Sequence, residues 1–171
     1  MFVTLLLCFL ISIPNMQINL IGIGQKMPSW VEIGFNQYAK RFPPTCQLNL
    51  IEIPLRKRTK NADLVRLQRQ EGEQMLAAIT HGTFILALDE RGRAWNTQQL
   101  AKQLAYWMQE YPTVALLVGG PEGLAKACSQ RAQHHWSLSA LTLPHQLVRV
   151  IVAEQLYRAW SLLNNHPYHR E

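Results

Sequence analysis

The chain has 171 residues, 48% of them hydrophobic and 16% charged, a composition that excludes a disordered chain and fits one globular domain. Its formal net charge of +6 favours a polyanionic partner, although a merely basic soluble protein fits this charge equally well. The three cysteines are widely spaced and form no CxxC pair, which argues against a disulfide framework and fits a reducing, cytoplasmic compartment.

Residues 1–15 differ from the rest of the chain. The stretch from Phe2 to Ile13 is almost wholly apolar, but it is shorter than the ~20 residues that a membrane span needs. No Lys or Arg precedes Lys26 and no small-residue cleavage site follows, so a secretory signal is not indicated either. We expect residues 1–15 to be an apolar leader or start-site extension outside the core, and residues 16–171 to form a single domain.

From Gln17 onward, apolar strand patterns alternate with helical ones. Such an alternation predicts a mostly parallel sheet flanked by helices, an α/β fold. The predicted strands are 18–23, 48–53, 84–88 and 114–118, with a further extended piece at 137–143; the predicted helices are 29–42, 62–79, one capped by Asn96 or Thr97, a short one from Leu124, and about 144–163.

The loop after the second predicted strand is strongly basic. Arg56, Lys57, Arg58 and Lys60 place four positive charges within five residues. Such a run is usually a solvated loop, but it also supplies the sequence-independent phosphate contacts that nucleic-acid binding needs. We therefore hold these four residues as candidates for binding RNA.

The rest of the chain is organised around the stretch 113–150. A buried-strand pattern there ends in Gly-Gly-Pro-Glu-Gly at 119–123, and a second extended piece ends at Pro144. Glycines allow positive φ and close backbone approach, and ligands of open α/β sheets bind outside the carboxyl ends of strands. A glycine-rich turn alone is weak evidence, because many such turns only join a strand to a helix.

Several motifs in order strengthen the case. They are IGIGQKMPSWVEIGF, KNADLVRLQRQEGEQML, LLVGGPEG, WSLSALTLPHQLVRVIVAEQLYRAW and a closing NHPYHRE. Together they resemble the ribosomal RNA large subunit methyltransferase H family, the pseudouridine N3-methyltransferases of the SPOUT class, from about Gln17 to Glu171. The resemblance implies a SPOUT-type sheet with a C-terminal trefoil knot, a homodimer, and S-adenosylmethionine as the cofactor.

The same resemblance implies where the cofactor binds. The matching positions are Leu88, Gly120, Ser139, Ala140, Leu141, Thr142, Leu143 and Pro144. Such a site needs a glycine without a side chain, backbone amides that are free to hydrogen bond to adenine, and apolar side chains around the adenine ring. Without the resemblance, Leu88 and Leu141 would be assigned to the core.

Four residues are candidates for the chemistry, namely His145, Tyr168, His169 and Arg170. The N3 of pseudouridine must lose a proton, and His145 directly after the cofactor segment is a candidate base. The resemblance implies that the polar, aromatic tail helps to form the site by reaching the cofactor of a neighbouring subunit. Tyr168 and His169 are candidates for stacking on the target base, and Arg170 is a candidate for holding a phosphate or a base carbonyl. A frayed terminus is the ordinary alternative for such a tail.

Two other patterns carry less weight. Glu122 is a further possible acid–base group, although stabilisation of a helix N-terminus explains it as well. Neither His134-His135 nor His166 with His169 is accompanied by the cysteine or carboxylate of a tetrahedral set, so no metal is expected.

The sequence, through this resemblance, therefore predicts an enzyme that methylates N3 of a pseudouridine in large-subunit ribosomal RNA. The resemblance further implies that its substrate is the assembled ribosome, and we expect no membrane partner. One alternative is a non-catalytic ribosome-binding module, which would need the basic loop but not Gly119-Gly120. Another is an NAD-dependent oxidoreductase. It is weakened because Met27 occupies the third glycine position after Gly22 and Gly24, and because no clear acidic ribose partner follows.

Overall fold

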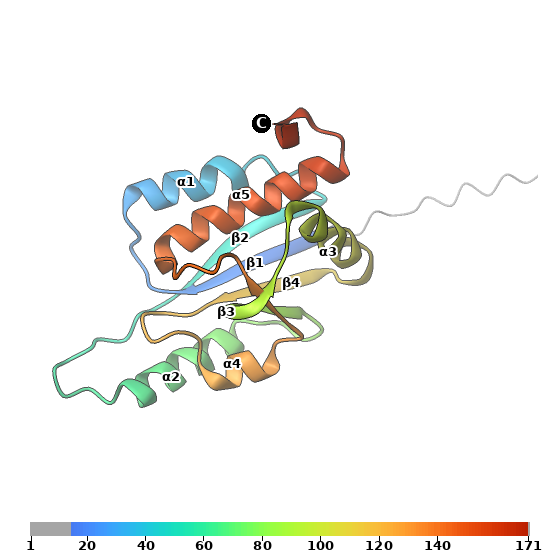
Figure 1. Cartoon of the computed structure of the whole chain (residues 1–171). Coiled ribbons are helices and arrows are strands. Elements are labelled where there is room, and N and C mark those ends of the chain that lie inside the picture. The colour runs from blue at the N-terminus through green and yellow to red at the C-terminus, as the bar shows by residue number, and fades with distance from the viewer. Residues whose placement is uncertain (1–14, 171) are drawn as a thin grey trace, which may run out of the picture.

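A computed structural model describes residues 15–170, so the predicted leader at 1–15 lies almost wholly outside the described part. Strands and helices alternate along the chain (Figure 1). In order they are β1 (Met16–Ile23), α1 (Ser29–Ala39), β2 (Cys46–Ile53), α2 (Leu64–Ala77), β3 (Phe84–Ala94), α3 (Thr97–Glu110), β4 (Thr113–Val118), α4 (Lys126–Arg131), β5 (His134–Ser137), α5 (His145–Leu163) and the 3-10 helix η1 (Pro167–Arg170).

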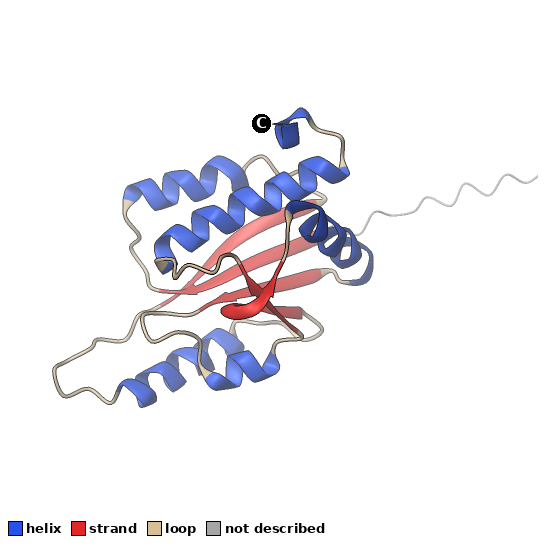
Figure 2. Cartoon of the chain, in the orientation of Figure 1, coloured by secondary structure: helices blue, strands red, loops and turns tan. Residues whose placement is uncertain are grey.

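The five strands form one sheet in the order β2-β1-β4-β3-β5, and every pairing is parallel. Helices α1, α3 and α5 cover one face, and α2 and α4 cover the other (Figures 1 and 2). A separate apolar cluster fills each of the two layers. The predicted parallel α/β sheet is thus confirmed, whereas the trefoil knot stays a prediction.

Buried apolar runs located the central strands well. β4 reads TVALLV and its last five residues are buried, as expected of a strand covered by helices on both faces. Asn96 caps α3 with a complete capping box, in which its side chain accepts from the Gln99 amide and the Gln99 side chain accepts from the Asn96 amide. Within residues 15–170, no helix has the length and apolar character needed to cross a membrane.

The strands predicted at 18–23 and 48–53 begin two residues earlier, at Met16 and Cys46, and the two larger errors in strand boundaries both lie beside β5. The strand predicted at 137–143 is instead β5, which ends at Ser137. Beyond it, the Ser137 hydroxyl donates to the Ser139 carbonyl and the Ser139 hydroxyl accepts from the Leu141 amide, so local side-chain bonds replace a strand ladder.

The strand predicted to end at Leu88 continues to Ala94. Its pairing with β5 resumes at Arg93 opposite Trp136 after an irregularity. This second pairing depends on Gly92, since a Cβ there would lie 2.7 Å from the backbone nitrogen of Trp136. The residues between Leu88 and Arg93 therefore arch away from the regular sheet.

The α2–α4 layer closes through Gly72. A Cβ built at this position would lie 2.4 Å from the Cβ of Ala125, and the Cys128 thiol donates to the Gly72 carbonyl. Glycine is about 1 kcal/mol worse than alanine inside a helix, so its presence here reflects packing rather than helix propensity.

We therefore expect Gly72→Ala to lower the free energy of unfolding by about 1–3 kcal/mol, despite the better helix propensity of alanine. Urea denaturation followed by circular dichroism measures this change. The double variant Gly72→Ala/Ala125→Gly removes the opposing methyl group and should recover most of the loss. A stabilised single variant would show that α2 and α4 do not meet at this contact.

Candidate active site

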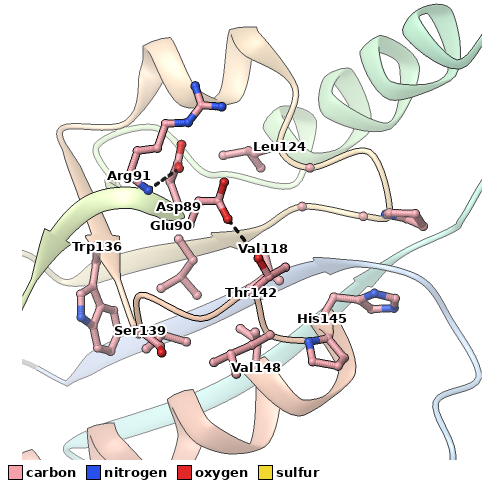
Figure 3. A pocket seen from close by; sticks show the side chains of 18 of the residues that line it. Asp89, Glu90, Arg91, Val118, Leu124, Trp136, Ser139, Thr142, His145 and Val148 are labelled. Carbon is pink, nitrogen blue, oxygen red and sulfur yellow. Dashed lines mark hydrogen bonds between the residues drawn. The ribbon is translucent and has the colours of Figure 1, made fainter.

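A cleft of about 680 Å³ opens beside the carboxyl ends of β4 and β5. Its walls come from three segments that are distant in sequence (Figure 3). They are residues 88–91 within β3, residues 118–124 from the end of β4 onward, and Trp136, Leu138, Ser139 and residues 141–145 from the end of β5 onward; Ser129 of α4 and Val148 of α5 complete the lining. Position and size are typical of a ligand site in a parallel α/β sheet.

The glycine-rich wall is a tight turn after β4. The Gly123 amide donates to the Gly120 carbonyl at 2.9 Å, and of the three glycines only Gly123 has positive φ. Gly119 serves close approach instead, because a Cβ there would lie 2.3 Å from the Gly123 carbonyl carbon. Of the two properties for which the sequence suggested these glycines, Gly123 shows positive φ and Gly119 shows close backbone approach. At Gly120 a Cβ would lie 3.1 Å from the side chain of Ile23.

The opposite wall is the irregular segment 138–144. Its Thr142 hydroxyl donates to a Glu90 carboxylate oxygen at 3.4 Å (Figure 3). This bond joins the segment to residues 89–92 of β3, which we call the β3 arch. Leu141 is 73% exposed and faces the cleft instead of the core. An exposed leucine on a cleft wall offers an apolar surface to a ligand.

Most of the predicted cofactor residues come together here. The cleft is lined by Leu88, Gly120, Ser139, Leu141, Thr142, Leu143 and Pro144, whereas Ala140 is exposed and lies outside the lining. Sequence reasoning missed the acidic edge formed by Asp89 and Glu90 and the indole of Trp136. The Asp-Glu-Arg-Gly run after an apolar strand was the available signal, but it was interpreted only as the end of that strand.

His145 begins α5 and lines the cleft (Figure 3). Partial burial, together with the positive charge of Arg149, holds the pKa of His145 below its ordinary value. The imidazole is therefore neutral at pH 7 and is able to accept a proton.

Arg149 lies one turn further along α5 and is fully buried. One guanidinium nitrogen donates to Glu52 at 2.7 Å, and another donates to the carbonyls of Ile23 and Gly24 at 3.0 Å. The guanidinium fits because Gly22 has no Cβ; one built there would lie 3.1 Å from Nη2. Sequence reasoning did not assign Arg149 a role, although a charge within the apolar run LVRVIVA was a visible signal.

The other predicted catalytic residues do not lie with His145. Tyr168, His169 and Arg170 belong to η1, which follows the far end of α5. At 1.5 Å per residue the 19 residues of α5 span roughly 28 Å. The tail turns back along the helix, because the Tyr168 hydroxyl bonds Glu154, and it thus lies about 14 Å of helix from His145.

Tyr168 is held against its own chain. Its hydroxyl donates to Glu154 at 3.0 Å, and its ring contacts those of Tyr38 and Tyr157. Burial, followed by hydrogen bonding to Tyr38 and Glu154, raises the pKa of Tyr168 above its ordinary value. The phenol is thus a neutral anchor, and Arg170 beyond it is exposed.

The basic loop divides into two kinds of cation. Arg56, Lys57 and Lys60 are exposed, as an RNA-binding role requires. Arg58 is partly buried and pairs with Glu71 and Glu122. Among residues 15–170, no three His, Cys, Asp or Glu side chains gather in a way that could hold a metal ion.

Comparison with known proteins adds two findings. The model of a family described as "Predicted SPOUT methyltransferase" matches residues 16–169. The chain is also similar to the ribosomal RNA large subunit methyltransferase H of Methylococcus capsulatus, with 57% identity over 155 residues. This match covers 91% of the present chain and the whole length of that relative.

We expect Arg149→Met to lower the free energy of unfolding by about 3–5 kcal/mol, because two buried carbonyls and a carboxylate lose their donor. Chemical denaturation measures the change. Arg69→Met is the matched control: Arg69 pairs with Glu73 on the surface of α2 and is 70% exposed, so its loss should matter by less than about 1 kcal/mol. Equal losses of unfolding free energy in the two variants would show that the buried hydrogen bonds of Arg149 contribute little to stability.

Proposed function

This chain belongs to the SPOUT methyltransferase family, and on that premise we propose that it methylates N3 of a pseudouridine in large-subunit ribosomal RNA, using S-adenosylmethionine. The observation that carries the proposal is the cleft of about 680 Å³ between the glycine-rich turn and the segment 138–144. Its volume and mixed apolar and polar walls fit a nucleoside-sized ligand.

The residues around the cleft fit the proposed donor. Leu88, Leu141 and Leu143 offer apolar surface for an adenine ring. On the opposite wall, crowding leaves no room for a side chain at Gly119 and little room at Gly120. Asp89 and Glu90 place carboxylates at the edge, which favours a ligand with positive charge. When bound, S-adenosylmethionine supplies a methyl group on a positively charged sulfur, so the leaving group is already activated.

The remaining tasks belong to the protein. The target base must be held in line with the methyl group, and its N3 must lose a proton. We assign the proton to His145 Nε2 or Nδ1, because this side chain lines the cleft and its lowered pKa keeps it neutral at pH 7. Arg149 helps to keep the resting imidazole neutral by raising the cost of a second positive charge close by, and the same effect makes the imidazole a weaker base.

We further propose that the enzyme works as a homodimer in which the tail of one chain completes the cleft of the other. The position of η1 supports this, since Tyr168 is anchored at Glu154 and not beside His145 of its own chain. Exposed apolar side chains on α1 also support it, namely Trp30 at 51% and Ile33 at 67%.

The substrate is proposed to be the assembled ribosome in the cytoplasm. Arg56, Lys57 and Lys60 supply exposed positive charge for phosphates. A net charge of +6 is modest for holding RNA unaided, so a shaped ribosomal pocket fits a small dimer better than naked RNA does.

The deciding experiment takes ribosomes from cells that lack the gene and treats them with purified protein and S-adenosylmethionine. Mass spectrometry maps the modifications of their ribosomal RNA before and after this treatment. We expect one pseudouridine to gain 3-methylation when the protein is added. Calorimetry with S-adenosylmethionine separates the enzyme from a non-catalytic ribosome-binding module, which should release no heat of binding.

We expect His145→Gln to reduce the single-turnover methylation rate on the order of a hundredfold or more, as loss of a general base does. In the unsubstituted enzyme the rate should fall as pH drops through the lowered pKa of His145, because protonation removes the accepting lone pair. The variant should lose this dependence. A variant that retains the full rate and the same pH profile would exclude His145 as the base.

A further inference from the structure

Arg58 differs from the other cations of the basic loop 56–60 in how it is held. Its side chain is 19% exposed, and its guanidinium lies between two carboxylates. Nη1 and Nη2 donate to Glu71 at 3.0 and 3.1 Å, while Nε donates to Glu122 at 3.0 and 3.2 Å and Nη2 also pairs with Glu122. Such two-sided fork geometry is available to arginine and not to lysine.

The two carboxylates belong to different parts of the fold. Glu71 is buried on α2, whereas Glu122 is part of the glycine-rich turn that forms one wall of the cleft. Arg58 hydrogen bonding lowers the pKa of Glu122, so this carboxylate stays ionised around neutral pH. The guanidinium therefore ties the turn after β4 to the helix α2 behind it.

A second α2 side chain fixes the same turn. Gln68 donates to the backbone carbonyl of Glu122 at 2.8 Å, with longer contacts of 3.4 Å to the carbonyls of Gly123 and Leu124. The basic loop is joined to this network through Arg56, whose amide donates to Glu71 at 2.7 Å and whose carbonyl accepts from Arg58 at 2.8 Å. Turn, helix and loop thus share one set of hydrogen bonds.

We propose that Arg58 is a positioning residue for the donor site and not an RNA-binding cation. It holds the glycine-rich wall, through Glu122, in the conformation that accepts the donor. This inference rests on the proposed function for the identity of the donor. It reassigns one of the four cations predicted to bind RNA and leaves Arg56, Lys57 and Lys60 in that role.

The test measures steady-state KM separately for S-adenosylmethionine and for ribosomes that lack the modification. For Arg58→Met we expect KM for the donor, and its Kd from calorimetry, to rise on the order of tenfold while KM for ribosomes changes little. Lys57→Ala should show the opposite pattern. Arg58→Lys keeps the charge but not the fork and should recover only part of the donor affinity.

Two further variants guard against a general loss of folding. Glu122→Gln keeps the shape of the turn and the Arg58–Glu71 pair, and it should raise KM for the donor by a smaller factor. Arg69→Met removes a surface Arg–Glu pair from the same helix and should leave both KM values unchanged. Wild-type donor affinity in both Arg58→Met and Glu122→Gln would overturn the proposal, as would a rise in KM for ribosomes alone.

Hydrogen exchange on the donor-free protein separates this inference from the proposed function. The amides of residues 119–124 should exchange faster in Arg58→Met than in wild type or Arg69→Met. If exchange rises as expected but the wild-type protein binds no S-adenosylmethionine, the positioning role stands and the proposed donor is wrong. Unchanged exchange in Arg58→Met would overturn the positioning role itself.

Discussion

One buried guanidinium sets the geometry on which the site depends. Removing the charge of Arg149 from water is unfavourable unless its donors find good acceptors. Nη1 donates to the carboxylate of Glu52 and Nη2 to the carbonyls of Ile23 and Gly24, whereas the buried Nε has no partner. These acceptors lie at the carboxyl ends of β1 and β2, which pair in register with Gly22 opposite Glu52. Because His145 lies one helical turn before Arg149, the same contact decides where the imidazole lies.

Close backbone packing supplies the second constraint. At Gly72 and Gly92 a Cβ would lie within 3 Å of a segment distant in sequence, and at Gly119 within 3 Å of the same turn, so each glycine allows a contact that a side chain would block. Gly92 brings β5 against the β3 arch, and Gly119 folds the turn after β4 onto itself. Both contacts shape the cleft walls directly. Gly72 acts at a distance from the cleft, because it allows α2 to pack closely against the start of α4, and α2 carries Gln68, which bonds the glycine-rich turn.

Sequence patterns predicted the sheet well because burial on both faces leaves long apolar runs, as in β4. They failed beside β5, where serine hydroxyls make local hydrogen bonds and Gly92 permits an irregular strand pairing. Neither effect produces a periodic pattern of apolar residues in the sequence. Leu141 shows the same limit in another form. Composition alone assigns a leucine to the core, whereas the family resemblance predicted a cofactor position there, and in the structure Leu141 is exposed on the cleft wall. The roles of Arg58 and Arg149 depend on partners 13 to 126 residues away, which one sequence does not identify.

The proposed dimer depends on where α5 places the two groups assigned to the site. His145 begins the helix, whereas the tail turns back only as far as Glu154, so in the proposed dimer the tail acts at the cleft of the other chain. A two-fold axis across α5 would lay two copies antiparallel and place each tail beside the other cleft, once per subunit. In that arrangement the firm attachment of Tyr168 to Glu154 has a purpose, because it fixes the base of the tail while leaving Arg170 exposed to the partner. A loosely attached tail would have to be ordered at each encounter, and its anchoring lowers that entropic cost.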